Sequence, residues 1–109
     1  MGKKYKVELT ELAQEQILQI AHYVSDELHA PDTANKLVDK LETEISKLET
    51  MPQRIVLMDR EPWHSRGVHK FIIDEHIAYF IIIEPEAVVR VIAVVLGRMD
   101  QIKQLEKAD

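Results

Sequence analysis

Residues 76–100, HIAYFIIIEPEAVVRVIAVVLGRMD, decide the fold of this chain. Two apolar runs, Ile77–Ile83 and Ala87–Leu96, flank the sequence Glu84-Pro85-Glu86. Both runs are rich in β-branched residues, which lose rotamer freedom in helices and pack well on a pleated sheet. Because each run is short and a turn signal separates them, the stretch predicts an antiparallel hairpin. A membrane-spanning helix is disfavoured, since it needs roughly 20 consecutive apolar residues.

The composition is that of one globular domain. The chain has 109 residues, of which 46% are hydrophobic and 30% charged, so we expect a single domain over residues 1–109. The lack of cysteine excludes a disulfide framework and a thiolate zinc site. A net charge of −5 weakens the case for nucleic-acid binding without removing it. No apolar signal segment follows the basic start, so we expect a cytoplasmic protein that does not enter membranes.

Two amphipathic helices are predicted before the hairpin. Residues 5–9, YKVEL, alternate as in a half-buried strand, and Thr10 is suited to cap the helix that follows. Apolar residues recur every three or four positions over Glu11–Leu28. The polar side of this helix is expected to carry Glu15, Gln16 and Gln19. Pro31 suits the first turn of a second helix, which Met51-Pro52 stops.

The remaining segments complete an α+β pattern. Residues 53–66 are the least regular, and within them residues 55–58 are either a short strand or an extended loop. Val68–Ile73 predicts a strand, Asp74-Glu75 a tight turn and Arg98–Glu106 a short C-terminal helix. We therefore expect a two-helix antiparallel hairpin packed on one face of a four-stranded, mostly antiparallel sheet, in the order β-α-α-β-β-β.

The whole chain resembles the ParE/RelE family of toxins from bacterial type II toxin–antitoxin modules. Three stretches carry the resemblance besides the order of elements. They are the Pro-led helix APDTANKLVDKLETEISKLETMP (residues 30–52), the strand HIAYFIII (residues 76–83) and the closing strand VVRVIAVVLGRMD (residues 88–100). The resemblance implies a small cytoplasmic toxin of RelE/ParE-like fold, neutralised by a cognate antitoxin that wraps an extended or helical segment around it.

The resemblance leaves the target open. RelE-like members are endoribonucleases that cut messenger RNA on the ribosome, whereas ParE-like members inhibit DNA gyrase and are not nucleases. RelE-like toxins often carry an Arg at the start of the third strand and another in the last strand. The matching positions here hold Ile77 and Ala93, and Met99 replaces a further basic residue, although Arg98 is present. Fewer cations mean weaker stabilisation of a phosphorane, which favours the ParE-like interpretation.

Five residues are candidates for catalysis if the chain is a ribonuclease. Cleavage by 2′-hydroxyl attack needs a base, an acid and cations at the phosphate. The candidates are His64, Arg66, Lys70, His76 and Arg98. The alternative is that these histidines belong to turns or to the surface. No two histidines have the four-residue helical spacing of a zinc motif, so neither a metal nor a cofactor is expected.

Three residues are candidates for contact with a target or partner. Trp63 lies in a polar, irregular segment, where an aromatic side chain either anchors a partner or pins the loop to the core. Arg90 interrupts an aliphatic strand, and it either pairs with Glu8 or Glu84 or offers its charge to a partner. Arg98 either contacts the target or forms a salt bridge near the C-terminus.

Aliphatic residues fall on both faces of the predicted sheet, as in Ile81-Ile82-Ile83. The helices cover one face, so we expect an exposed apolar patch on the other, to be covered by an antitoxin segment or in a homodimer. The first hypothesis is a ParE-like gyrase inhibitor from a plasmid-stabilisation module. The alternatives are a RelE-like ribosome-dependent endoribonuclease and an inactive relative that only binds its partner or itself.

Overall fold

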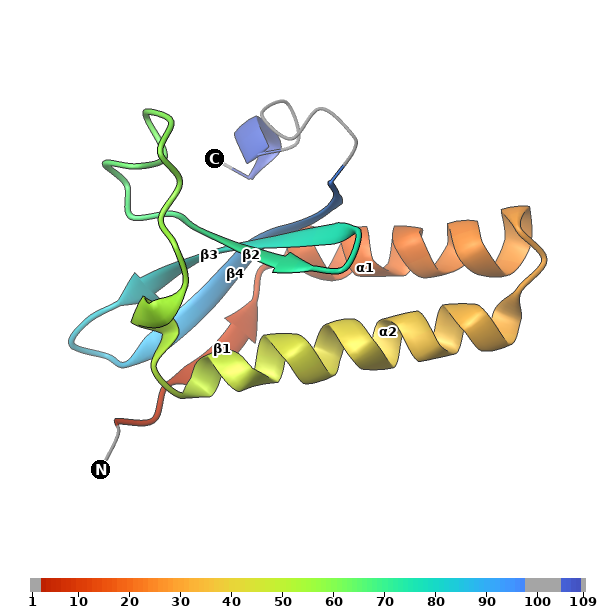
Figure 1. Ribbon diagram of the computed structural model, residues 1–109, viewed down its shortest axis with the longest axis horizontal. Helices are drawn as coiled ribbons and strands as arrows, with labels where there is room; N and C mark the ends of the chain where they lie inside the picture. Colours follow the sequence, from red (N-terminus) through yellow and green to blue (C-terminus); the bar gives the residue numbers. More distant parts are fainter. Residues whose placement is uncertain (1–2, 98–104, 109) are drawn as a thin grey trace.

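The computed structural model describes residues 3–97 and 105–108. The order of elements matches the α+β prediction (Figure 1). Their bounds are β1 Lys6–Leu9, α1 Glu11–His22, η1 Tyr23–Glu27, α2 Pro31–Ser46, η2 Lys47–Glu49, η3 Pro52–Arg54, β2 His69–Ile73, β3 His76–Ile83 and β4 Val88–Leu96. Among the described residues, no helix is long and apolar enough to cross a membrane.

The four strands form one sheet in the order β1-β4-β3-β2. The expected hairpin is confirmed over residues 76–96, with β3 and β4 antiparallel and a turn over residues 84–87, whereas residues 98–100 lie outside the described part of the chain. β2 is antiparallel to β3, and β1 is parallel to β4, as expected for a mostly antiparallel sheet. Tyr79 pairs with Ala93 and Phe80 pairs with Val91, so Ile92 is an extra residue that bulges β4.

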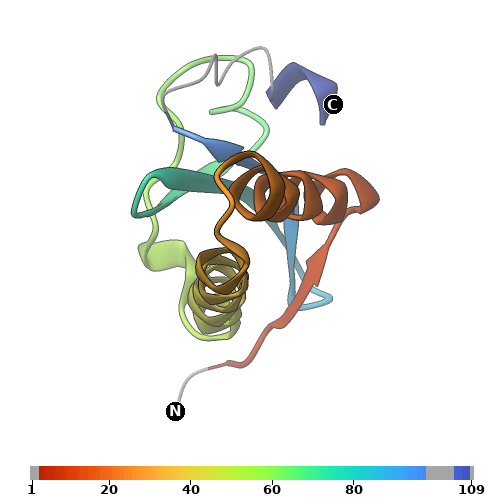
Figure 2. The same ribbon diagram turned by 90° about the vertical axis from the view of Figure 1, so that its right-hand side faces the viewer.

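The two helices form the expected antiparallel hairpin (Figures 1 and 2). The Thr10 side chain accepts a hydrogen bond from the Ala13 N–H at 3.2 Å, which caps α1 as predicted. The π-helical turn η1 continues α1 to Glu27, so the helical segment ends near the predicted Leu28. α2 begins at Pro31, and a 3-10 turn, η2, extends it to Glu49.

The helices bury one face of the sheet. The hydrophobic core between them contains side chains from both helices and from β2, β3 and β4. Its buried members are Tyr5, Ala13, Ile17, Leu41, Ile45, Leu48, Ile73, Ala78, Phe80, Val89, Val91 and Val94. This arrangement follows from the apolar stripes of the two helices, which need a common apolar surface.

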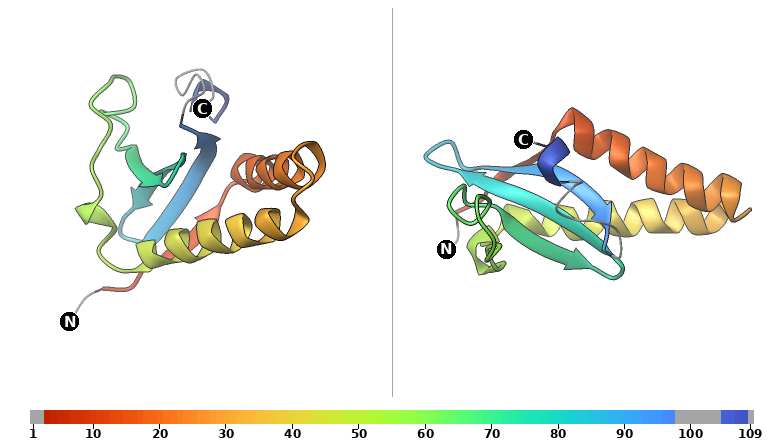
Figure 3. Two further views of the ribbon diagram at one scale, coloured as in Figure 1. Left: turned by 45° about the vertical axis from the view of Figure 1, so that its right-hand side comes forward. Right: turned by 90° about the horizontal axis from the view of Figure 1, so that it is seen from above.

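The other face of the sheet carries a second hydrophobic core. The expectation of an exposed apolar patch on this face is therefore wrong for the part of the sheet that this core covers. The buried members are Met58, Trp63, Val68, Ile77, Tyr79, Ala93, Val95 and Leu105. The segment between η3 and β2, together with the helical turn over residues 105–107, lies on the side away from the helices (Figure 3). The chain therefore covers this apolar surface with its own residues.

The irregular segment is an extended loop tied to the edge strand. The Met58 N–H donates to the Val68 carbonyl at 2.8 Å, and the Lys70 N–H donates to the Val56 carbonyl at 2.9 Å. One isolated bridge joins Leu57 to His69. These bonds partly cover the edge of β2 and hold the loop over the second face.

Candidate functional site

The sheet separates two of the five catalytic candidates. Lys70 on β2 pairs directly with Tyr79 on β3, so these two side chains share the face that carries the second core. His76 pairs with Ile73, which belongs to the core under the helices. His76 and Tyr79 are three positions apart in one strand and therefore point to opposite faces. Lys70 and His76 cannot meet at one phosphate in this fold.

The remaining catalytic candidates lie in the loop or outside the described residues. His64 is exposed, and its Nδ1 donates to the Met58 carbonyl at 2.7 Å, which stabilises the loop. Arg66 is exposed two residues further along the same loop. Arg98 lies outside the described residues. General acid–base catalysis requires groups within hydrogen-bond reach of one reacting atom, and Lys70 and His76 do not meet this requirement.

The two positions at which the sequence lacks the arginines of RelE-like toxins are buried. Ile77 is 4% exposed and Ala93 is fully buried, and both pack in the second core beside Tyr79. Burial raises the pKa of the Tyr79 phenol, which keeps it protonated and neutral. The positions of Ile77 and Ala93 are therefore part of a covered apolar core rather than of a phosphate site.

Trp63 and Arg90 have structural roles in the free chain. Trp63 is 5% exposed and belongs to the second core, so it pins the loop rather than presenting an aromatic anchor. Arg90 Nε donates to Glu8 Oε1 at 2.9 Å across the β4–β1 pair, which is one of the two partners expected for it. Both side chains of this ion pair are partly exposed, so it contributes little to stability.

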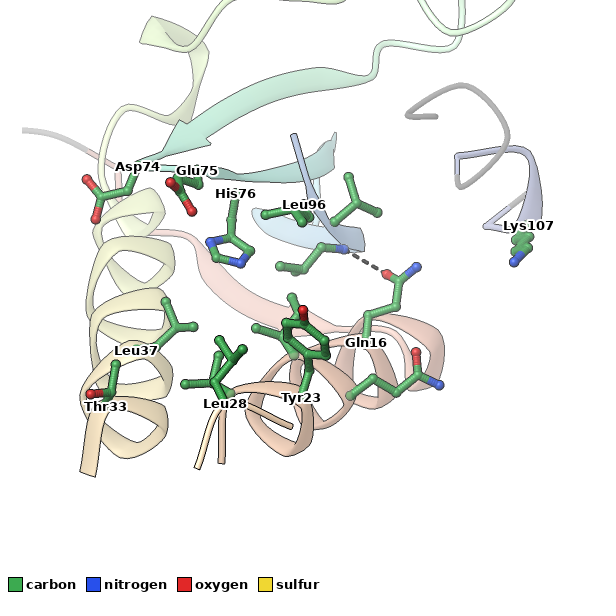
Figure 4. A pocket seen from close by; sticks show the side chains of 15 residues that line it. Gln16, Tyr23, Leu28, Thr33, Leu37, Asp74, Glu75, His76, Leu96 and Lys107 are labelled. Atoms are coloured by element: carbon green, nitrogen blue, oxygen red, sulfur yellow. Dashed lines mark hydrogen bonds between the residues drawn. The ribbon is translucent and has the colours of Figure 1, made fainter. Parts of the chain in front are cut away.

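A cleft of about 980 Å³, which the sequence did not predict, lies between the sheet and the end of the helix hairpin where α1 turns into α2 (Figure 4). Its residues come from α1, η1 and the residue after it, the start of α2, the β2–β3 turn, the start of β3, the end of β4 and the C-terminal turn. They are Gln16, Gln19, Ile20, Tyr23, Val24, Leu28, Thr33, Leu37, Asp74, Glu75, His76, Val94, Val95, Leu96 and Lys107. These segments are distant in sequence, so a local pattern could indicate at most one wall of the cleft.

The mouth of the cleft exposes large apolar side chains. Tyr23 is 53% exposed and Leu28 is 56% exposed, and both line the cleft together with the less exposed Leu37. Concave apolar surfaces of this size are typical of binding sites. The sequence contains one signal for this surface. The apolar stripe of the first helix continues to Leu28, past the part of the helix that packs against β4.

Two buried polar side chains, Gln16 and His76, line this cleft. His76 is 7% exposed, and its Nδ1 has no hydrogen-bond partner among the described residues. Burial lowers the pKa of His76, against the opposite effects of the Glu75 and Asp74 carboxylates. Asp74 is itself paired with Lys40 at 2.9 Å. His76 is therefore neutral near pH 7, whereas the side-chain oxygen of Gln16, the other buried polar group, already accepts from the Val94 N–H.

A metal site is not formed by the described part of the chain. Within residues 3–97 and 105–108, no three histidine, aspartate or glutamate side chains lie close enough together to hold a metal ion. The cleft is lined mainly by aliphatic, aromatic and uncharged polar side chains. Its composition is suited to a peptide segment rather than to a charged cofactor.

The family model of the ParE toxin of the type II toxin–antitoxin system parDE matches residues 7–101. Among solved structures, the chain is similar to the chromosomal ParDE toxin–antitoxin system from P. aeruginosa, with a TM-score of 0.69 and 18% identity over 86% of this chain and 97% of that one. No match was found among curated proteins.

Two RelE-type structures share the fold. The toxin–antitoxin complex RelBE2 from Mycobacterium tuberculosis gives a TM-score of 0.57 and 16% identity over 85% of this chain and 98% of that one. A mutant of the E. coli toxin RelE in the free state gives a TM-score of 0.60 and 12% identity, over 95% of this chain and 97% of that one.

Proposed function

This chain belongs to the family of ParE toxins of type II toxin–antitoxin systems, and we propose that it inhibits DNA gyrase in the cytoplasm until a cognate antitoxin neutralises it. The family match over residues 7–101 is the observation that carries the proposal. The structure supports the proposal because both helices, the strands β2 to β4 and all residues that line the cleft except Lys107 lie within the matched residues 7–101.

The arrangement of charges favours a gyrase inhibitor over a ribonuclease. A ribosome-dependent endoribonuclease needs cations and acid–base groups gathered at one phosphate. Here Lys70 and His76 lie on opposite faces of the sheet, and the positions of Ile77 and Ala93 are buried in an apolar core. The net charge of −5 adds no attraction for messenger RNA. An inhibitor that acts by binding has no need of such a constellation.

The cleft is the proposed site of the antitoxin. Two of the similar structures are described as toxin–antitoxin systems or complexes, which supports an antitoxin partner for this chain. Exposed Tyr23 and Leu28 at an apolar cleft provide the surface that a partner segment would bury. The second face of the sheet is a weaker candidate because residues of the chain already cover its apolar end.

Three assays test the proposed target. Expression of the chain in bacteria should stop growth, and co-expression of the product of the adjacent reading frame should restore it. The purified chain should inhibit supercoiling by DNA gyrase and should not induce cuts in a translated message in primer extension. Cuts in the message without gyrase inhibition would establish the RelE-like alternative, and normal growth under both conditions would leave an inactive relative.

A matched pair of variants tests the proposed site. Leu28 lines the cleft, whereas Leu18 is equally exposed on α1, at 59%, but lies outside it. Leu28→Asp should weaken binding of the adjacent gene product and abolish rescue of growth, because it places a charge in an apolar interface. Leu18→Asp should leave rescue unchanged. Equal behaviour of the two variants would exclude the cleft as the antitoxin site.

A further inference from the structure

The two ring nitrogens of His76 have different surroundings. Nδ1 is buried and has no hydrogen-bond partner among the described residues. Nε2 is not among the buried atoms without a partner, and no hydrogen bond joins it to the described residues, so it is accessible. Figure 4 shows the imidazole projecting from its strand toward the cleft, which His76 lines. Nε2 is therefore the atom that an occupant of the cleft can reach.

The burial of Nδ1 indicates which nitrogen carries the proton. A neutral imidazole has one N–H donor and one lone pair. An N–H left buried without an acceptor is rarer in proteins than an acceptor left without a donor. The favoured tautomer places the lone pair on Nδ1 and the proton on Nε2. His76 thus presents a hydrogen-bond donor to the cleft.

The charges around the ring restrict the acceptor. Asp74 and Glu75 precede His76 in the β2–β3 turn and line the cleft, and Lys40 on α2 pairs with Asp74. Tyr23 from η1 and Lys107 from the C-terminal turn are the other titratable groups of the lining. Lys40 offsets the charge of Asp74, so the repulsion of a carboxylate brought by an occupant comes chiefly from Glu75. An uncharged oxygen on an otherwise apolar segment is the acceptor that fits.

We propose that His76 is the recognition point of the cleft, where its Nε2–H donates to an uncharged oxygen, such as an amide or hydroxyl oxygen, of an apolar antitoxin segment. This inference rests on the proposed function, because it takes the antitoxin as the occupant. It adds the polar group that the occupant must carry and the atom that selects it. A segment without such an oxygen would bury the Nε2–H unpaired, which costs affinity.

Calorimetry with the product of the adjacent reading frame tests the role of His76. His76→Phe keeps an aromatic ring and removes the donor, and His22→Phe is the matched control on an exposed histidine outside the cleft. We expect roughly tenfold weaker binding for His76→Phe and unchanged binding for His22→Phe. Leu28→Asp, measured beside them, reports whether the cleft is occupied at all.

The combination of results separates this inference from the proposed function. Weaker binding of both Leu28→Asp and His76→Phe supports the cleft as the antitoxin site and His76 as its recognition point. Weaker binding of Leu28→Asp alone overturns the role of His76 while the antitoxin site stands. Unchanged binding of Leu28→Asp, or no binding of the adjacent gene product to the unaltered chain, overturns both.

Nitrogen NMR of the His76 ring tests the same inference without a substitution, so it holds even if His76→Phe fails to fold. In the free chain we expect the proton on Nε2, and in the complex we expect a ring that stays neutral at pH about 7 with a perturbed Nε2 resonance. A proton on Nδ1, or an unchanged ring on binding, would overturn the role of His76. A charged ring in the complex would overturn the proposal that the acceptor is an uncharged oxygen, because it would indicate a carboxylate partner.

Discussion

The side-chain oxygen of Gln16 on α1 accepts a hydrogen bond of 2.8 Å from the backbone N–H of Val94 on β4. β1 pairs with β4 only as far as Val91, and Thr10 then leads the chain into α1. The Val94 N–H lies beyond this point and would have no acceptor on the β1 side. Gln16 is 7% exposed and supplies that acceptor from the helix. A side chain thus completes the hydrogen bonding of a central strand.

Replacing Gln16 should destabilise the fold. Gln16→Met keeps the length of the side chain and removes the acceptor, leaving a buried N–H unpaired at a cost of about 1–3 kcal/mol in the free energy of unfolding. Gln19→Met is the matched control, because Gln19 is exposed on the same helix. Urea unfolding followed by circular dichroism measures both. Equal unfolding midpoints for the two variants would show that the Val94 N–H finds another partner.

Trp63 should be the main support of the loop over the second face of the sheet. It is the only tryptophan of the chain and packs with Met58 and Leu105. Trp63→Ala removes a large buried ring and should lower the free energy of unfolding by roughly 3 kcal/mol. Arg60→Ala, at an exposed position of the same loop, should change it by less than about 0.5 kcal/mol.

The fluorescence of Trp63 offers a check without a substitution. Native emission should be blue-shifted and poorly quenched by acrylamide compared with the unfolded chain, because the indole is shielded from solvent. Emission like that of the unfolded chain at native conditions would mean that the loop does not cover the sheet in solution.

Local patterns predicted most of the fold because its elements are locally consistent. The hairpin followed from two β-branched runs around Glu84-Pro85-Glu86, and the cap at Thr10 followed from one hydroxyl before a helical stripe. Gln16 was assigned to the polar side of its helix, and this was wrong. Its burial depends on where β1 ends and on how α1 crosses β4, which are tertiary features.

The candidate site was harder to predict for the same reason. Placing His76 and Lys70 on opposite faces requires the register between β2 and β3, which the sequence does not show. The apolar residues of β3 and β4 correctly indicated aliphatic side chains on both faces of the sheet, although the second face was expected to be exposed. That residues around Trp63, rather than a partner, cover one of them depends on the path of an irregular loop.

The turn of the central hairpin is bonded to the N-terminal segment, and this contact should make stability sensitive to acid. Glu84 accepts hydrogen bonds of 2.5 Å from Lys3 Nζ and from Tyr5 Oη. The Lys3 contact first, and the Tyr5 hydroxyl second, lower the pKa of Glu84 from its ordinary value of 4.5. A carboxylate with a depressed folded-state pKa stabilises fully above its unfolded value and less as the pH falls through the folded value.

The test compares two glutamates of the same turn. Glu84→Gln should reduce the loss of stability between pH about 7 and pH about 3, measured by urea unfolding. Glu86→Gln should keep the acid sensitivity of the unaltered chain, because no hydrogen bond or ion pair of its exposed side chain is formed within the described residues. A parallel loss in all three proteins would show that other carboxylates dominate.

His76 should make the stability of the free chain fall at mildly acidic pH. Burial depresses its folded-state pKa below the ordinary 6.5, against the pull of the Glu75 and Asp74 carboxylates. The unfolded chain therefore binds the proton more readily, so the stabilisation is complete above pH 6.5 and is lost as the pH falls through the folded value. His76→Phe should flatten this dependence between pH about 8 and pH about 5, whereas His22→Phe should retain it. Identical slopes for the two variants in urea unfolding would show that His76 is as easily protonated in the folded chain as in the unfolded one.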